Sequence, residues 1–394
     1  MLGLSRREIE RRVQQVLSEL ERKKLDALYV ASPTNIVYLT GFYHIPTERP
    51  LATVILSSGE RILIVPKLEE DHARRYAYVD RVLSYGEYPD EKHPMFIIAD
   101  YLKQLGLEGK RIGYDSDGHP HIHGYRGPRL SEVFKASYSY ERDLIERMRM
   151  RKSEEEIALI KESAKWCSLG LRLLQKYVRP GLFEEEIALK ATLEATAAMA
   201  RTLSGIYIPG RYSAGTQAYF RGQVGKHSFY PHSLPMFSIV RRGDVLIGEA
   251  FAPVNGYSAE LERTLIVGRP TPEQEKFFKL MMEARKLAFE SIRAGVRCAD
   301  VDRAVRRFFK ERGLMEYWRH HTGHGIGLEG HEAPFFDVGD DTVLEEGMVM
   351  SVEPGIYVEG LGGFRHSDTI VVTRDGYEIL TKYPDELEDM VIDV

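Results

Sequence analysis

Four histidines occur among glycines in the segment HHTGHGIGLEGHEAP, residues 320–334. An imidazole titrates near neutral pH and is a common metal ligand, so this segment is suited to proton transfer or to metal binding. His324 stands between two glycines, which allow other backbone to approach whatever its ring contacts. His331 is the candidate for stabilising an oxyanion or carrying a proton. A lone histidine is more often structural, so a functional role requires partners from other segments.

The segment GDVLIGEAFAPVNGYSAELERTLIVG, residues 243–268, supplies acidic partners. It reads as two strands around an Asn-Gly pair at 255–256, the strongest short hairpin signal. With a two-residue loop, Glu249 faces Glu262, and Glu260 lies on the same face because side chains alternate along a strand. Clustered carboxylates require a counter-charge. That charge is a metal ion, a cationic substrate group, an arginine or a proton.

Composition and charge restrict the class of protein. At 394 residues the chain is too long for one ordinary core, so two domains are expected. The net charge of −5 provides no broad basic field, and no nucleic-acid partner is expected. Two cysteines, Cys167 and Cys298, cannot form a disulfide framework, which favours a reducing compartment. Since no signal-peptide core and no membrane span is recognisable, we expect a cytoplasmic protein without a membrane partner.

The segments that position these groups fall into two parts. Residues 5–23 have helical apolar spacing, and strands and helices alternate after them, as in an α/β domain. A long helix begins near Ser153, which has capping-box spacing to Glu156, and strands and hairpins follow. We therefore predict one domain over residues 1–147 and a second over residues 148–394.

Five segments of the second part form an ordered set of motifs. They are PHS at 231–233, the hairpin at 243–268, GHGIG…HE at 323–332, MVMSVEPGIYV at 348–358 and GGFRHSDT at 362–369. Together they resemble the pita-bread family of creatinase, prolidase, aminopeptidase P and methionine aminopeptidase, and SPTNIVYLTGF at 32–42 resembles the start of the creatinase-type N-terminal domain. The resemblance implies an α+β fold, with a pita-bread catalytic domain (a curved antiparallel sheet covered by helices) and a smaller α/β N-terminal domain. It also implies a homodimer.

The resemblance implies a metal site with altered ligands. Metallopeptidases of this family hold two metal ions with two aspartates, one histidine and two glutamates. Here the aspartate positions fall on Glu249 and Glu260, whereas His324 and Glu353 are as expected. The last glutamate position falls on Ser367, which is not a normal ligand. We therefore expect one divalent ion (Mn, Co, Zn or Fe) at Glu249, Glu260, His324 and Glu353, rather than a metal pair.

A second set of residues resembles creatinase, which has a similar fold but works without a metal. The run LERT at 261–264 matches its hairpin motif, His232 stands where its catalytic histidine stands, and Glu353 matches its second carboxylate. This resemblance implies that His232 transfers a proton or binds a substrate carboxylate. It also implies that Glu262 grips a cationic substrate group and that no cofactor is needed.

Other polar groups are candidates for catalysis or binding. Glu353 is positioned in its motif to orient an attacking water as general base. Arg365 is the expected counter-charge of the acidic cluster and a substrate-binding candidate, because a guanidinium holds a carboxylate bidentately. A loop that reads as pocket-lining contains Tyr207, Arg211, Tyr212, Arg221 and Tyr230. Supporting or surface positions are expected for His320, His321 and His366.

Three functional hypotheses follow. The first is a hydrolase that cleaves a C–N bond of a small peptide-like substrate, an Xaa-Pro dipeptidase-like metallopeptidase in which a divalent ion activates water and polarises the carbonyl. The second is a metal-independent hydrolase of amidine-type compounds, similar to creatinase or ectoine hydrolase. The third is a non-catalytic pita-bread scaffold that binds a peptide or a partner protein.

Overall fold

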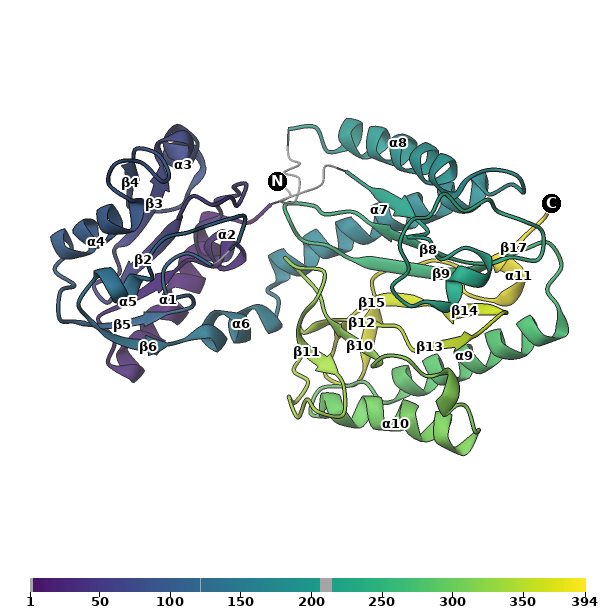
Figure 1. Ribbon diagram of the computed structural model, residues 1–394. Coiled ribbons are helices and arrows are strands. Elements are labelled where there is room, and N and C mark those ends of the chain that lie inside the picture. The colour runs from purple at the N-terminus through teal and green to yellow at the C-terminus, as the bar shows by residue number, and fades with distance from the viewer. Residues whose placement is uncertain (1–2, 121, 206–214) are drawn as a thin grey trace. The chain divides into compact units, whose positions relative to one another are not determined.

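The computed structural model describes residues 3–120, 122–205 and 215–394. Its contacts divide the chain into two compact units, Leu4–Arg149 and Met150–Val394, the second of which includes Gly3 (Figure 1). This division lies at 149/150, beside the domain boundary that the sequence places at 147/148.

The first unit is an α/β domain built on a mixed sheet. Its described strands form one six-stranded sheet in the order β4-β3-β2-β1-β5-β6, in which β1 is antiparallel to β2 and parallel to β5. The strands are β1 (Ala27–Val30), β2 (Ala52–Leu56), β3 (Arg61–Pro66), β4 (Arg81–Tyr85), β5 (Arg111–Tyr114) and β6 (Ser137–Tyr140). The helices are α1 (Arg6–Lys23), α2 (Pro33–Thr40), η1 (Lys67–Glu69), α3 (Glu70–Tyr76), α4 (Pro94–Gln104), α5 (Leu130–Val133) and α6 (Arg142–Met150).

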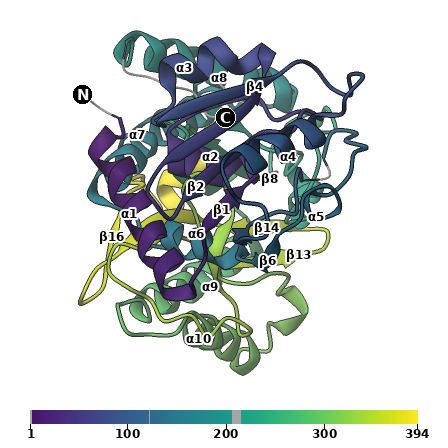
Figure 2. The same cartoon turned by 90° about the vertical axis from the view of Figure 1, so that its left-hand side faces the viewer.

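Helix α1, labelled in Figure 2, confirms the helix predicted over residues 5–23. Its apolar residues recur every three or four positions and are buried on one face; they are Ile9, Val13, Val16 and Leu20. Ser5 caps the helix, since its hydroxyl accepts a hydrogen bond of 3.1 Å from the Glu8 amide. The apolar spacing and the cap together fix where this helix begins and which face it buries.

The second unit is dominated by an antiparallel sheet. Among the described residues the sheet has nine strands, in the order β11-β10-β12-β15-β9-β8-β7, with β16 paired to β15 and β17 to β9. Its strands are β7 (Gln217–Tyr219), β8 (Val245–Phe251), β9 (Glu260–Val267), β10 (Gly323–Gly325), β11 (Glu332–Phe336), β12 (Val349–Val352), β15 (Ser367–Val372), β16 (Tyr377–Ile379) and β17 (Val391–Ile392). A separate two-stranded ribbon joins β13 (Gly355–Val358) and β14 (Gly362–Arg365).

Helices pack against this sheet (Figure 1): α7 lies next to β8 and β9, α8 next to β7, α9 next to β12 and α10 next to β11. The helices are α7 (Glu154–Tyr177), α8 (Glu184–Thr202), η2 (Gly225–Phe229), α9 (Pro272–Glu290), α10 (Cys298–Glu311), η3 (Met315–Tyr317) and α11 (Leu387–Met390). The predicted capping box of α7 is present, because Ser153 and Glu156 each accept a hydrogen bond from the other's amide. The predicted α+β architecture, with a pita-bread domain and an α/β N-terminal domain, is confirmed. No helix in the described part of the chain is long and apolar enough to cross a membrane.

The predicted acidic hairpin is also confirmed. Glu249 of β8 lies directly opposite Glu262 of β9. Asn255 and Gly256 form the turn, with φ of 46° and 77°, values typical of the type I′ turn that suits a hairpin. The sequence thus determines both the register of the two strands and the face on which the glutamates lie.

Candidate active site

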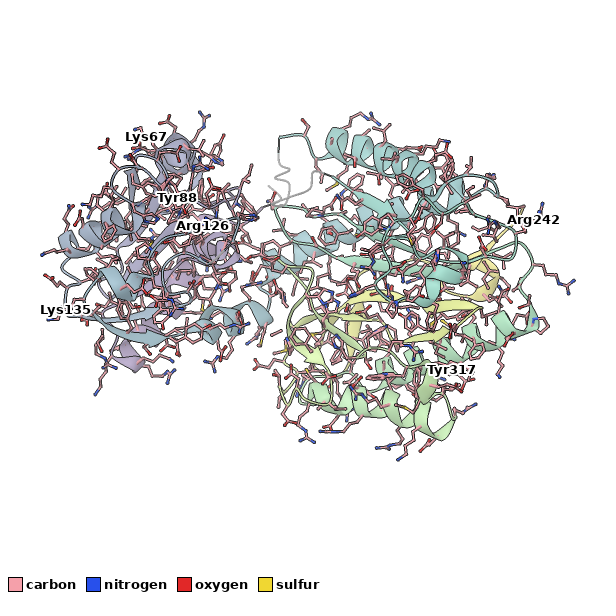
Figure 3. All side chains as sticks on the ribbon, viewed as in Figure 1. Lys67, Tyr88, Arg126, Lys135, Arg242 and Tyr317 are labelled. Atoms are coloured by element: carbon pink, nitrogen blue, oxygen red, sulfur yellow. The ribbon has the colours of Figure 1, made fainter. Side chains whose placement is uncertain are left out.

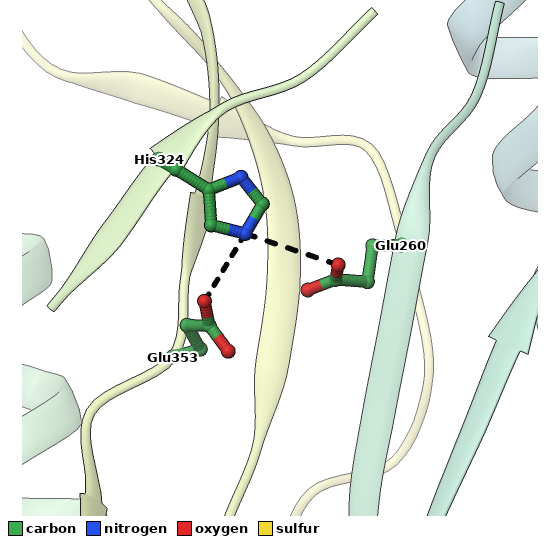
Figure 4. Close-up of side chains that lie close together, drawn as sticks. All are labelled: Glu260, His324 and Glu353. Carbon is green, nitrogen blue, oxygen red and sulfur yellow. Dashed lines mark ion pairs between the residues drawn. The ribbon is translucent and has the colours of Figure 1, made fainter. Parts of the chain in front are cut away.

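Most charged side chains lie on the surface of their unit, as Lys67 and Arg242 do in Figure 3, so buried carboxylates are exceptions. Glu260, His324 and Glu353 are such an exception (Figure 4). Each offers a ligand atom, and these atoms all lie within 4.8 Å of one another. The Nε2 atom of His324 is 3.1 Å from Oε1 of Glu353 and 3.9 Å from Oε2 of Glu260.

Glycines bring these three residues together. Gly323 and Gly325 flank His324 on β10, which lies between β11 and β12. A Cβ atom on Gly323 would be 2.1 Å from the Ser351 carbonyl oxygen, and one on Gly325 would be 2.6 Å from that of Ala333. Only glycine therefore allows β10 to lie this close to its neighbours and to present His324 to the carboxylates.

The orientation of His324 suits metal binding. Its Nδ1 atom lies 3.0 Å from the Gly325 carbonyl oxygen, so Nδ1 carries a proton and Nε2 faces the carboxylates. Nε2 is buried and has no aligned hydrogen-bond partner among the described residues. One imidazole nitrogen and two carboxylates form a donor set for a single divalent ion, so the residues present fit such a group.

The electrostatics of the cluster lead to the same conclusion. Burial lowers the pKa of His324, but the contact with Glu353 and the charge of Glu260 outweigh burial and raise it to about 9. Burial, with the charges of Glu353 and Glu249, raises the pKa of Glu260 to about 7. Burial opposes the ionisation of Glu353, yet the His324 contact lowers its pKa overall. Without a metal, this cluster holds protons where a cation would be favourable.

The other two hairpin glutamates have protein partners. Oε1 of Glu249 accepts a hydrogen bond of 2.9 Å from the Tyr219 hydroxyl, and its Oε2 lies 3.4 Å from Nη1 of Arg221. Arg365 binds both carboxylate oxygens of Glu262 through Nε and Nη2. Among the described residues, the ligand atoms that lie close together therefore belong to Glu260, His324 and Glu353. Glu249 is not part of this group.

Ser367 lies opposite Glu262 in the register of β15 and β9. Its hydroxyl donates a hydrogen bond of 2.7 Å to Oε1 of Glu260. It therefore orients one carboxylate of the cluster and brings no charge of its own.

A row of alternating side chains completes the polar surroundings; of its three members, only Arg221 was a candidate from the sequence. Two of these residues, Tyr219 and Arg221, contact the Glu249 carboxylate. The third, Gln223, accepts a hydrogen bond of 3.5 Å at its Oε1 from Arg365. The period-two pattern in AYFRGQV was the available signal.

Tyr230, another candidate of the predicted pocket-lining loop, is more than half exposed. The other candidates of the predicted pocket-lining loop, Tyr207, Arg211 and Tyr212, lie outside the described residues.

Two histidines adjoin the cluster. The rings of His331 and His324 are stacked, with centroids 3.7 Å apart. Burial, followed by the charge of His324, lowers the pKa of His331 to about 4, so this imidazole is neutral at pH 7. His232 is exposed, and partial burial with the positive charges of Arg221 and Arg365 lowers its pKa.

Two of the three histidines expected to have supporting roles, His320 and His321, lie beside this centre. His320 contacts the Tyr357 hydroxyl at 2.8 Å, and this hydroxyl accepts a hydrogen bond of 3.0 Å from Arg365. His321 packs edge-on against the ring of His324. His366 is fully buried against Phe278.

A buried ion pair fixes the loop that carries His331. Nζ of Lys152 lies 3.3 Å from Oε2 of Glu332, and both side chains are almost completely buried. Oε1 of Glu332 accepts a hydrogen bond of 2.9 Å from the Glu329 amide. Lys152 therefore anchors the loop end next to His331.

Comparisons with known proteins identify similar families, sequences and structures. Residues 158–374 match the model of metallopeptidase family M24, and residues 12–151 match the creatinase/prolidase N-terminal domain. The putative dipeptidase YkvY of Bacillus subtilis is 30% identical over 95% of this chain and 99% of its own length. The solved Xaa-Pro dipeptidase from Bacillus anthracis is 26% identical, covers 97% of this chain and 99% of its own, and has a TM-score of 0.82. The prolidase from Pyrococcus horikoshii OT3 is 27% identical, with coverages of 96% and 99% and a TM-score of 0.79.

Proposed function

The chain belongs to metallopeptidase family M24 and is a hydrolase of that family. From this premise we propose that it is an Xaa-Pro dipeptidase-type enzyme that binds one divalent ion. The cluster of Glu260, His324 and Glu353 carries the proposal, because a buried imidazole nitrogen without an aligned partner lies there beside two carboxylates. Two of the solved relatives are named Xaa-Pro dipeptidase and prolidase, which supports the substrate class.

The chain's own residues have distinct roles in the proposed reaction. A divalent ion bound to Glu260, His324 and Glu353 would supply Lewis acidity for the scissile carbonyl and for water. Glu353 accepts the proton of the attacking water on its carboxylate, since its pKa is lowered and it is ionised at pH 7. Neutral His331 donates a hydrogen bond to the developing oxyanion. Exposed His232 binds the substrate carboxylate.

Glu262 and Arg365 have a positioning role in this proposal. Arg365 binds both oxygens of Glu262 and also donates to the Tyr357 hydroxyl at 3.0 Å. A carboxylate held bidentately by arginine is not free to grip a cationic substrate. We therefore rank the amidine hydrolase below the dipeptidase. The non-catalytic scaffold ranks last, because the proton-carrying groups are all retained.

Substrate hydrolysis before and after metal removal tests the proposal. Full-length protein is stripped with a chelator, reloaded with Mn, Co, Zn or Fe, and assayed on Ala-Pro and on Ala-Ala as the matched control dipeptide. We expect cleavage of Ala-Pro that disappears on chelation and returns with metal. Chelator-resistant turnover of cyclic amidines would favour the second hypothesis, and the absence of any turnover would contradict both enzymatic readings.

Cytoplasmic location and a homodimer remain part of the proposal. Light scattering on the purified protein measures the molar mass, for which we expect about twice the 45.1 kDa of one chain.

A further inference from the structure

Arg221 lies between two carboxylates that face each other across the hairpin. Its Nη1 atom is 3.4 Å from Oε2 of Glu249, and its Nη2 atom is 3.8 Å from Oε1 of Glu262. These two glutamates are direct partners in the register of β8 and β9. Two like charges so placed would destabilise the sheet without a cation between them, and the guanidinium supplies that cation.

The backbone holds Arg221 in a conformation that few side-chain-bearing residues adopt. Its φ is 50°, in the left-handed region, and Gly222 follows with φ of 73°. A Cβ atom on Gly222 would lie 1.9 Å from the Leu234 carbonyl oxygen, and the Gly222 amide donates a hydrogen bond of 2.8 Å to Glu184. Backbone strain of this kind persists only when the surroundings fix it, and it is common at functional sites.

A second contact fixes the guanidinium itself. Nη2 of Arg221 donates a hydrogen bond of 3.3 Å to the Pro231 carbonyl oxygen. The side chain is therefore tied at both ends, by its strained backbone and by this carbonyl, and it does not merely fold onto the nearest acidic group.

The charges of the centre then match one divalent ion. Four carboxylates gather there; they are Glu249, Glu260, Glu262 and Glu353. Arg221 and Arg365 are their two guanidinium partners, which leaves a charge of −2 when the histidine is neutral. Ser367 contributes a hydroxyl to Glu260 and no further negative charge. A second divalent ion would meet Arg221 beside Glu249 and would have no charge left to neutralise.

We propose that Arg221 is a built-in counter-cation that occupies the position beside Glu249, so that the centre accepts a single divalent ion at Glu260, His324 and Glu353. Glu249 is then a partner of Arg221 and Tyr219 and not a metal ligand. The inference rests on the proposed function only in that a divalent ion is bound.

Metal stoichiometry tests the inference without reference to activity. Chelator-stripped full-length protein is titrated with Co²⁺ by calorimetry, and bound cobalt is counted by elemental analysis. We expect one equivalent in the wild type. For Arg221→Ala we expect about tenfold tighter binding, because a positive charge near the ion is lost, whereas Arg221→Lys should stay near the wild type. Arg293→Ala, which removes an exposed arginine of the same unit, is the control for net charge.

A second set of variants separates the effect of the Arg221 charge from the effect of having serine instead of a carboxylate at position 367. Ser367→Glu alone should still bind one equivalent, whereas Arg221→Ala with Ser367→Glu should bind two. In variants that keep Arg221, Glu249→Gln should weaken Co²⁺ binding by no more than about tenfold, the effect of one nearby charge, and Glu260→Gln by more than about 100-fold, since only the second is a ligand.

The outcomes distinguish the two proposals. Two equivalents in the wild type, or an Arg221→Ala affinity equal to that of Arg293→Ala, would overturn the inference and leave the dipeptidase proposal standing. No bound ion in any form would overturn both. Circular dichroism and melting curves confirm that each variant is folded, and the wild-type stoichiometry is decisive even if one variant is not.

Discussion

Glu353 combines three properties at the scale of a single residue: it is buried, it contacts His324, and its pKa is lowered. We expect Glu353→Gln to reduce kcat on the cleaved dipeptide by about 10²–10⁴-fold, because the amide accepts no proton from water. Steady-state kinetics with metal-loaded enzyme measures the change. Glu359→Gln, the same substitution at an exposed position on the neighbouring turn, is the control. Equal activity in both variants would contradict the role of Glu353.

Proton competition makes metal binding depend on pH. In the metal-free protein the pKa of His324 is raised to about 9 and that of Glu260 to about 7. A ligand must lose its proton before it binds, so affinity should rise with pH and should fall as pH is lowered through these values. We expect a slope of log affinity against pH of about one between pH 7 and 9, and a steeper slope just below pH 7. Co²⁺ absorbance titrations at fixed pH values measure the slope, and a flat profile would contradict it.

At the scale of the element, strand β10 depends on its glycines. We expect Gly323→Ala to destabilise the second unit by about 2–4 kcal/mol and to weaken metal binding, because its methyl group would meet the Ser351 carbonyl oxygen at 2.1 Å. Chemical denaturation and Co²⁺ titration measure both effects. Gly330→Ala is the matched control, since a Cβ atom there has no described heavy atom within 4 Å. A similar loss in both variants would mean that the glycines of this segment do not act through close packing.

The loop before β11 depends on a buried ion pair. Lys152→Met removes the buried ammonium group that lies 3.3 Å from the Glu332 carboxylate, and we expect a loss of about 3–5 kcal/mol in the free energy of unfolding. Lys161→Met removes the lysine of an exposed pair with Glu378 and should cost less than about 1 kcal/mol. Urea denaturation of both variants measures the difference. Restoration of stability by the double change Lys152→Met with Glu332→Leu would identify the broken charge pair as the cause.

At the scale of the whole molecule, the proposed metal site belongs to one of two compact units. A divalent ion that binds only the folded second unit should stabilise that unit by about 2.7 kcal/mol at a free concentration 100 times Kd. We expect calorimetry to show one thermal transition that shifts upward with Co²⁺ and another that does not. The His324→Ala variant should lose the shift. An equal shift of every transition would show that the two units unfold together.

Local patterns in the sequence determined the hairpin and the identity of the acidic cluster. The Asn-Gly turn and the alternation of side chains are properties of neighbouring residues, so they predicted that Glu249 faces Glu262 and that Glu260 shares their face. The capping box of α7 and the apolar face of α1 were predicted for the same reason. The ordered motifs predicted the two-domain architecture.

Arg365 was expected from the sequence as a counter-charge, but only the tertiary structure decided the partners of Arg221 and Lys152. Arg221 was visible as a loop residue, but its place between Glu249 and Glu262 depends on a strained turn fixed by Glu184 and Leu234. Lys152 and Glu332 are 180 positions apart and meet only because the second unit folds around its sheet. The reach of a guanidinium or an ammonium group is set by backbone that is distant in sequence, so no local pattern encodes the partner. For that reason the sequence predicted that a cation lies beside the hairpin glutamates, and only the tertiary structure showed that Arg221 is such a cation.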